Sequence, residues 1–191
     1  MRGGPACKSW LVPNSNLMLL SLSDVYGPNE IPLDNEIPLD ICKERNDMSD
    51  SVFILNGPNL NMLGTREPEY YGVETLAQIE ERCQALGQEL GFDIDFRQSN
   101  SEGDLVDWIQ QSAGAHRAIL LNAGAYTHTS IAIHDALKAC GVPVIEVHLS
   151  NIFQREEFRH TSHISSLAKG VICGFGGTGY ELALRAVAQL D

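Results

Sequence analysis

The feature that most constrains the fold is a regular alternation, after about residue 48, of short apolar runs with longer amphipathic stretches. The apolar runs are rich in β-branched residues, which is typical of strands buried on both faces. We expect strands at 51–55, 92–97, 117–122, 143–149 and 170–173. We expect helices, from an apolar period of about 3.6 residues, at 73–90, 103–114, 129–140, 155–168 and 178–190.

Strands that alternate with helices form a parallel sheet, because parallel neighbours need a crossover that is usually helical and right-handed. About 140 residues of this pattern predict an α/β fold, a flavodoxin-like doubly wound sheet of five parallel strands in the order 2-1-3-4-5, with helices on both faces. Ligands of such sheets bind beyond the carboxyl ends of the strands, where the strand order reverses. We therefore expect a site where strands 51–55 and 117–122 end.

Residues 1–47 have a different character. They contain five of the eight prolines and an exact tandem repeat, NEIPLD at 29–34 and again at 35–40. These prolines interrupt any apolar periodicity that would indicate a helix or a strand. We predict a poorly ordered N-terminal extension at 1–47 and one catalytic domain at 48–191.

Charge and cysteine usage restrict the possible partners. With 13 Lys and Arg against 25 Asp and Glu, the formal net charge is −12. This charge argues against non-specific binding to nucleic acid or to an anionic membrane, and the sequence has no apolar run of 18 residues that would span a bilayer. The five cysteines show no C-x-x-C spacing, so we expect reduced cysteines and a cytoplasmic protein. A small-molecule substrate remains the best expectation.

The predicted strand ends carry a particular set of chemical groups. The segment after the first strand, 56–72, is long for a βα connection, which usually has about 2–6 residues, and it contains Arg66, Tyr70 and Tyr71. The ends of the strands expected at 117–122 and 143–149 contribute His128 and His148. These loops contain no lysine for a Schiff base and no nucleophile elbow. Tyrosine and histidine are therefore the groups left for proton transfer, with arginine to supply positive charge.

A tyrosine base requires help, because its unperturbed pKa is about 10. A desolvated arginine nearby stabilises tyrosinate and lowers that pKa. A tyrosinate base paired with a histidine acid suits the removal of a proton next to a carbonyl group, followed by the loss of water. The residues alone indicate this class of chemistry.

Five segments resemble the signatures of the type II 3-dehydroquinate dehydratases, or type II dehydroquinases, and occur in the order of that family. They are NGPNLNMLGTREPEYYG at 56–72, RQSNSEG at 97–103, LNAGAYTHTS at 121–130, EVHLSN at 146–151 and REEFR at 155–159. The resemblance extends over the predicted catalytic domain. Residues 1–47 have no counterpart in it.

The resemblance implies a lyase that eliminates water in the anti sense from 3-dehydroquinate to give 3-dehydroshikimate through an enolate. Such an enzyme serves the shikimate pathway, toward chorismate and the aromatic amino acids, or quinate breakdown. Tyr71, directly before the glycine, would be the base, and Arg66 would lower its pKa. Asn59 would hold the water that hydrogen-bonds the enolate oxygen. His148 would give a proton to the departing hydroxyl, and Glu146 would orient His148.

The resemblance also implies a set of substrate-binding groups and an assembly. Leu149 and Ser150 would bind the substrate carboxylate through their backbone amides. Asp135 would reach the site of a neighbouring subunit, which implies a homo-oligomer, typically a dodecamer built of trimers. Neither a cofactor nor a metal is expected. The complete substrate-binding set is Asn122, His128, Asp135, Leu149, Ser150 and Arg159.

Taken singly, these residues have simpler explanations. His148 suits a hydrogen-bonded core position, and His128 suits a cap for a helix that starts near Thr129. The run GFGGTG at 174–179 fits the dinucleotide motif, but it follows the last strand instead of the first, so we expect a tight turn there. Two other functions share the fold. A flavin mononucleotide electron carrier would be yellow, and an inactive scaffold or sensor would show no turnover.

Overall fold

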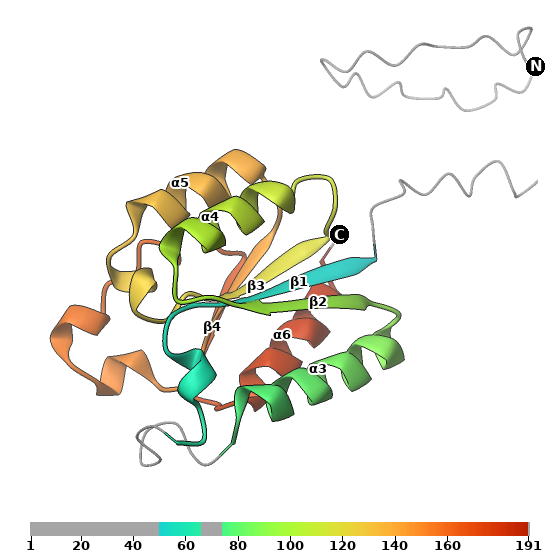
Figure 1. Ribbon diagram of the computed structural model, residues 1–191, viewed down its shortest axis with the longest axis horizontal. Helices are drawn as coiled ribbons and strands as arrows, with labels where there is room; N and C mark the ends of the chain where they lie inside the picture. The colour runs from blue at the N-terminus through green and yellow to red at the C-terminus, as the bar shows by residue number, and fades with distance from the viewer. Residues whose placement is uncertain (1–49, 66–73, 191) are drawn as a thin grey trace, which may run out of the picture. The chain divides into compact units, whose positions relative to one another are not determined.

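The computed structural model describes residues 50–65 and 74–190, so the predicted extension at 1–47 lies outside the described residues. The sheet has five parallel strands in the order β2-β1-β3-β4-β5, which confirms the predicted fold class (Figure 1). The strands are β1 (Ser51–Asn56), β2 (Asp93–Gln98), β3 (Ala118–Asn122), β4 (Val144–His148) and β5 (Gly170–Cys173).

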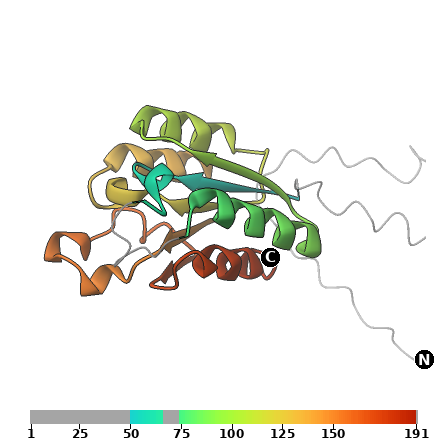
Figure 2. The ribbon, with the colours of Figure 1, turned by 60° about the horizontal axis from the view of Figure 1, so that its bottom comes forward.

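Four helices of ten residues or more cover the sheet within the described ranges. They are α3 (Leu76–Leu90), α4 (Glu102–Gln111), α5 (Ile131–Cys140) and α6 (Thr178–Val187). Helices α3 and α6 pack on one face, and α4 and α5 pack on the other (Figure 2). In this part of the chain no helix is both long enough and apolar enough to cross a membrane.

The central strands explain why their sequences read as continuous apolar runs. Successive side chains of a strand point to opposite faces. Val52 and Ile54 of β1 belong to the core under α3 and α6, while Phe53 and Leu55 belong to the core under α4 and α5. All four are fully buried. A strand covered on both faces therefore needs an apolar residue at every position.

Hydroxyl side chains determine where three of the helices begin. Thr75, Ser101 and Ser130 accept backbone N–H groups in the first turns of α3, α4 and α5, which satisfies donors that have no partner inside the helix. The Ser130 hydroxyl accepts the N–H of Ile133 at 2.9 Å. The alternative in which His128 caps this helix is therefore wrong.

The helix predicted at 155–168 is also wrong. The chain forms two short 3-10 helices, η4 (Ile152–Gln154) and η5 (Glu157–Arg159), and then turns. The Ser162 hydroxyl accepts the N–H groups of both Ile164 and Ser165, each at 3.0 Å. Such local side-chain bonds compete with the helical ladder, and they leave the segment folded against the end of the sheet.

The ends of β1 and β3 approach very closely at Gly57. Its N–H donates to the carbonyl oxygen of Asn122 at 2.8 Å. A Cβ atom at position 57 would lie 2.3 Å from the carbonyl oxygen of Ala123. Because the obstructing atom belongs to the backbone, a side-chain rotation cannot relieve the contact.

We therefore expect Gly57→Ala to lower the free energy of unfolding by about 3 kcal/mol, because a clash with backbone forces the two strand ends apart. Urea denaturation measures the change. The matched control is Gly103→Ala in the first turn of α4, where the nearest atom to the added Cβ is 3.7 Å away. That variant should be neutral or more stable by up to about 1 kcal/mol. Equal losses in both variants would contradict this reading.

Candidate active site

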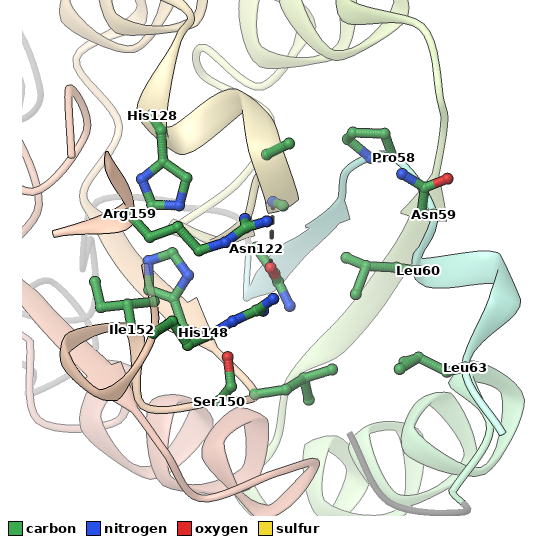
Figure 3. A pocket seen from close by; sticks show the side chains of 14 residues that line it. Pro58, Asn59, Leu60, Leu63, Asn122, His128, His148, Ser150, Ile152 and Arg159 are labelled. Carbon is green, nitrogen blue, oxygen red and sulfur yellow. Dashed lines mark hydrogen bonds between the residues drawn. The ribbon is translucent and has the colours of Figure 1, made fainter. Parts of the chain in front are cut away.

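A hollow opens where the sequence predicts a ligand site, beyond the carboxyl ends of β1, β3 and β4. Figure 3 shows the side chains of His128, His148 and Arg159 on one side of it and the segment from Pro58 to Leu63 on the other. The lining residues are Pro58, Asn59, Leu60, Leu63, Asn122, Gly124, Ala125, His128, His148, Leu149, Ser150, Ile152, Arg155 and Arg159.

The hollow brings together most of the predicted site residues that the structure describes. Glu146 lies behind the wall, bonded to His148. Asp135 is exposed on α5 and does not line this hollow. Arg66 and Tyr71, the predicted base and its neighbour, lie outside the described residues. The predicted residues that line the hollow are Asn59, Asn122, His128, His148, Leu149, Ser150 and Arg159.

Asn59 sits in an unusual backbone conformation, with φ at 67° and ψ at 0°. Asparagine tolerates this left-handed region better than most residues. Its N–H donates to the side-chain oxygen of Asn100 at 2.9 Å, and the same oxygen accepts from the Gln98 amide at 3.0 Å. The segment after β2 therefore holds Asn59 at the mouth of the hollow.

The Glu146 carboxylate is fully buried and has four donors. Its Oε1 atom accepts from the hydroxyls of Thr127 at 3.1 Å and Ser162 at 2.8 Å, and lies 2.9 Å from Nε2 of His148. Its Oε2 atom accepts from the Ser165 hydroxyl. Each donor helps to replace the water that burial removed from the carboxylate.

These contacts determine the charge of the Glu146 carboxyl group. Burial raises the pKa of Glu146, but the hydrogen bonds from His148, Ser165 and Ser162 outweigh it, so that the pKa lies below its ordinary value. Glu146 is therefore ionised at neutral pH. Because an ionised carboxylate only accepts hydrogen bonds, Nε2 of His148 carries a hydrogen. The other ring nitrogen, Nδ1, is then the one that can exchange a proton with a bound molecule.

The His128 ring is a second imidazole in the hollow, and its orientation is fixed independently of His148. Its Nδ1 atom lies 2.8 Å from the carbonyl oxygen of Thr161, which can only accept, so Nδ1 carries the hydrogen. Burial lowers the pKa of His128, and although the bond to Thr161 opposes this shift, the charges of His148 and Arg159 reinforce it. The ring is therefore neutral at pH 7, with Nε2 free of hydrogen and able to accept. It lies nearly parallel to the His148 ring, with the centroids 6.4 Å apart.

Positive charge and backbone donors complete the site. Arg159 donates from Nε to Glu156 at 2.9 Å, and Arg155, whose side chain is only 11% exposed, lines the hollow beside it. The backbone N–H groups of Leu149 and Ser150 meet no acceptor among the described residues. Sequence reasoning missed Arg155, although it opens the REEFR segment. Together, the two arginines and the two backbone N–H groups are suited to bind a carboxylate.

The glycine run forms the turn expected before α6. The N–H groups of Gly174 and Gly176 donate to the carbonyl oxygens of His148 at 3.2 Å and Leu149 at 2.9 Å. Two amides that a phosphate cradle would use are thus bonded to the strand that carries the site. Within residues 50–65 and 74–190, no three His, Cys, Asp or Glu side chains form a group that could hold a metal ion.

The Glu146 network predicts a specific pH dependence of stability. We expect Glu146→Gln to lower the free energy of unfolding by about 3 kcal/mol at pH 7, because several donors lose a charged acceptor. The folded pKa of Glu146 lies below its ordinary value of 4.5. The stabilisation is therefore complete above pH 4.5 and is lost as the pH falls through the folded pKa.

Urea denaturation of both proteins from pH 7 to pH 3 measures this difference. The gap between wild type and Glu146→Gln should narrow below pH 4.5. Glu89→Gln, an exposed position on α3, is the matched control and should follow the wild type throughout. A gap that stays constant with pH would show that the ionised carboxylate is not the stabilising species.

Comparisons with known proteins agree with this geometry. A family model described as dehydroquinase class II matches residues 50–188. The 3-dehydroquinate dehydratase of Rhizobium etli (strain CIAT 652) is 57% identical over 143 residues, which cover 75% of this chain and 99% of the relative. The 3-dehydroquinate dehydratase of Brucella canis (strain ATCC 23365 / NCTC 10854 / RM-666) is 59% identical over 143 residues, covering 75% of this chain and 91% of the relative.

A solved structure shares the fold as well. The crystal structure of type II dehydroquinase from Propionibacterium acnes superposes with a TM-score of 0.71 at 46% sequence identity, covering 75% of this chain and 99% of that chain. The family match extends over most of the chain, and both the sequence and the strand order agree with it. The chain therefore belongs to the class II dehydroquinase family.

Proposed function

We propose that this chain is a 3-dehydroquinate dehydratase of the shikimate pathway, which removes water from 3-dehydroquinate to give 3-dehydroshikimate. The observation that carries the proposal is the His148–Glu146 pair, which places a histidine with one committed ring nitrogen on the wall of the hollow. Membership of the family identifies 3-dehydroquinate as the proposed substrate. The residue roles below are part of the proposal.

His148 acts as the acid. In its charged form the ring is stabilised by the ionised Glu146 carboxylate, which accepts the Nε2 hydrogen at 2.9 Å. Nδ1 then gives its proton to the departing hydroxyl oxygen. The carbon–oxygen bond breaks, water leaves, and the electron pair of the enolate forms the new carbon–carbon double bond while the ketone is restored. This preorganised proton donor is worth on the order of 100-fold to 10,000-fold in rate.

Tyr71 acts as the base that takes the proton next to the ketone. Its assignment rests on the motif, in which the tyrosine directly precedes Gly72, since position 71 lies outside the described residues. Arg66, five residues earlier, lowers the pKa of Tyr71 by stabilising tyrosinate. Asn59 holds a water against the enolate oxygen, and its place on the lining of the hollow supports that role.

The remaining lining groups hold the substrate. The unbonded amides of Leu149 and Ser150 bind its carboxylate, with Arg159 supplying positive charge. The neutral His128 ring accepts from a hydroxyl group through Nε2, and Asn122 makes a further contact. Donors thus face the carboxylate and an acceptor faces a hydroxyl, which matches the polar groups of 3-dehydroquinate.

The exposed position of Asp135 on α5 supports an oligomer. Asp135 does not line the hollow of its own chain, so we assign it to the site of a neighbouring subunit in a homo-oligomer, a dodecamer built of trimers. The free cysteines Cys83, Cys140 and Cys173 support a reducing, cytoplasmic setting. Burial raises the pKa of Cys83 to about 12, so that thiol stays protonated and unreactive.

Turnover is tested by the ultraviolet absorbance of the conjugated enone product, with no metal or nucleotide added. We expect the wild type to convert 3-dehydroquinate. Tyr71→Phe should lower kcat by at least about 100-fold, since it removes the base, while circular dichroism stays unchanged. The matched control is Tyr70→Phe, the adjacent phenol, which should retain activity. Full activity of Tyr71→Phe, or loss in Tyr70→Phe alone, would overturn the assignment of the base.

A further inference from the structure

We propose that Tyr180 of α6, which does not line the hollow, is a positioning residue that fixes the Asn122 side chain through a hydrogen-bond chain of set direction. The inference rests on the proposed function, in which Asn122 contacts the substrate. It adds to that function a residue outside the resembling segments. It also specifies which atom of Asn122 the substrate meets.

The chain of bonds joins α6 to the ends of two strands. The Tyr180 hydroxyl donates to Oδ1 of Asn56 at 2.6 Å and accepts from Nδ2 of Asn122 at 2.8 Å. Asn56 ends β1 and Asn122 ends β3. Tyr180 and Asn56 are fully buried, and Asn122 is 3% exposed. Buried polar groups of this kind depend on one another, because water cannot replace a missing partner.

One end of the hydrogen-bond chain fixes the direction of its bonds. Nδ2 of Asn56 donates to the carbonyl oxygen of Arg97 at 3.1 Å. Since a carbonyl only accepts, the Asn56 amide must turn its nitrogen toward Arg97 and its oxygen toward Tyr180. The single hydroxyl proton of Tyr180 is then committed to Asn56. Burial also raises the pKa of Tyr180, so that proton is retained.

The other end fixes the same direction independently. Oδ1 of Asn122 accepts the N–H of Gly124 at 3.3 Å, the dashed contact in Figure 3. A backbone N–H only donates, so the oxygen of the Asn122 amide must face Gly124 and its nitrogen must face Tyr180. Both ends of the hydrogen-bond chain are therefore satisfied by the same orientation of the Asn122 amide.

This orientation determines what Asn122 offers to a bound molecule. Its oxygen faces and accepts from the Gly124 N–H, and one of the two hydrogens on Nδ2 is donated to Tyr180. The other hydrogen remains, on a residue that lines the hollow. Asn122 therefore acts as a donor and selects an acceptor oxygen of the substrate. Without Tyr180, only the 3.3 Å bond from the Gly124 N–H holds the amide in this orientation, and Nδ2 loses its buried acceptor.

Tyr180→Phe removes only the hydroxyl and keeps the ring in the core. It leaves Nδ2 of Asn122 without an acceptor and Oδ1 of Asn56 without a donor. Because Asn122 binds the substrate and does not react, we expect KM for 3-dehydroquinate to rise about tenfold while kcat changes less than about twofold. A role confined to stability would leave KM unchanged.

A double-mutant cycle tests whether Tyr180 acts through Asn122. Steady-state kinetics are measured for wild type, Tyr180→Phe, Asn122→Ala and the double variant. The tenfold loss in kcat/KM caused by Tyr180→Phe should fall to less than about twofold when Asn122 is already alanine. The same loss in both backgrounds, or no loss in the first, overturns the proposal. Val187→Ala, buried on the same helix, is the control and should lower Tm without changing KM.

Two further measurements keep the proposal falsifiable. Asn56→Leu breaks the same chain one bond further from the hollow, and it should give the same Asn122-dependent loss if Tyr180→Phe does not fold. Should the wild type fail to convert 3-dehydroquinate, the proposed function fails, and side-chain amide NMR then tests the orientation alone. Exchange protection of the Asn122 amide that disappears in Tyr180→Phe supports the chain, and protection that persists overturns it.

Discussion

The site depends on one buried carboxylate, that of Glu146. Its four donors come from three separate parts of the chain, with Thr127 after β3, His148 in β4, and Ser162 and Ser165 in the segment after η5. An unpaired carboxylate at this depth would destabilise the fold by several kcal/mol. The loops must therefore be in place together, and the arrangement that satisfies the charge also orients the His148 ring.

Just as Glu146 fixes the orientation of the His148 ring, a separate chain of hydrogen bonds fixes the orientation of the Asn122 amide. It runs from the Arg97 carbonyl through Asn56 and Tyr180 to Asn122, and every bond in it has a fixed direction. At neutral pH each system starts from groups that have one hydrogen-bonding role, an ionised carboxylate that accepts in one case and backbone atoms in the other. The fold thus determines where hydrogens point in the site before any substrate arrives.

The sequence predicted the sheet and the edge that carries the site, because buried parallel strands and crossover helices leave strong local periods. It also predicted the side chains His128, His148 and Arg159 that line the hollow. It failed at 155–168, where the hydroxyls of Ser162 and Ser165 replace a helical ladder with bonds to Glu146, 16 and 19 residues away. Local patterns likewise give no sign of Tyr180, whose partners lie 58 and 124 residues away.

We infer that ionised Glu146 holds a hydrogen on Nε2 of His148 and leaves Nδ1 as the ring nitrogen available for proton transfer. The most direct test is the ¹⁵N NMR spectrum of the His148 ring across a pH titration. We expect the neutral ring to carry its hydrogen on Nε2, with Nδ1 free of hydrogen, wherever Glu146 is ionised. A neutral His148 ring with its hydrogen on Nδ1 would contradict this inference.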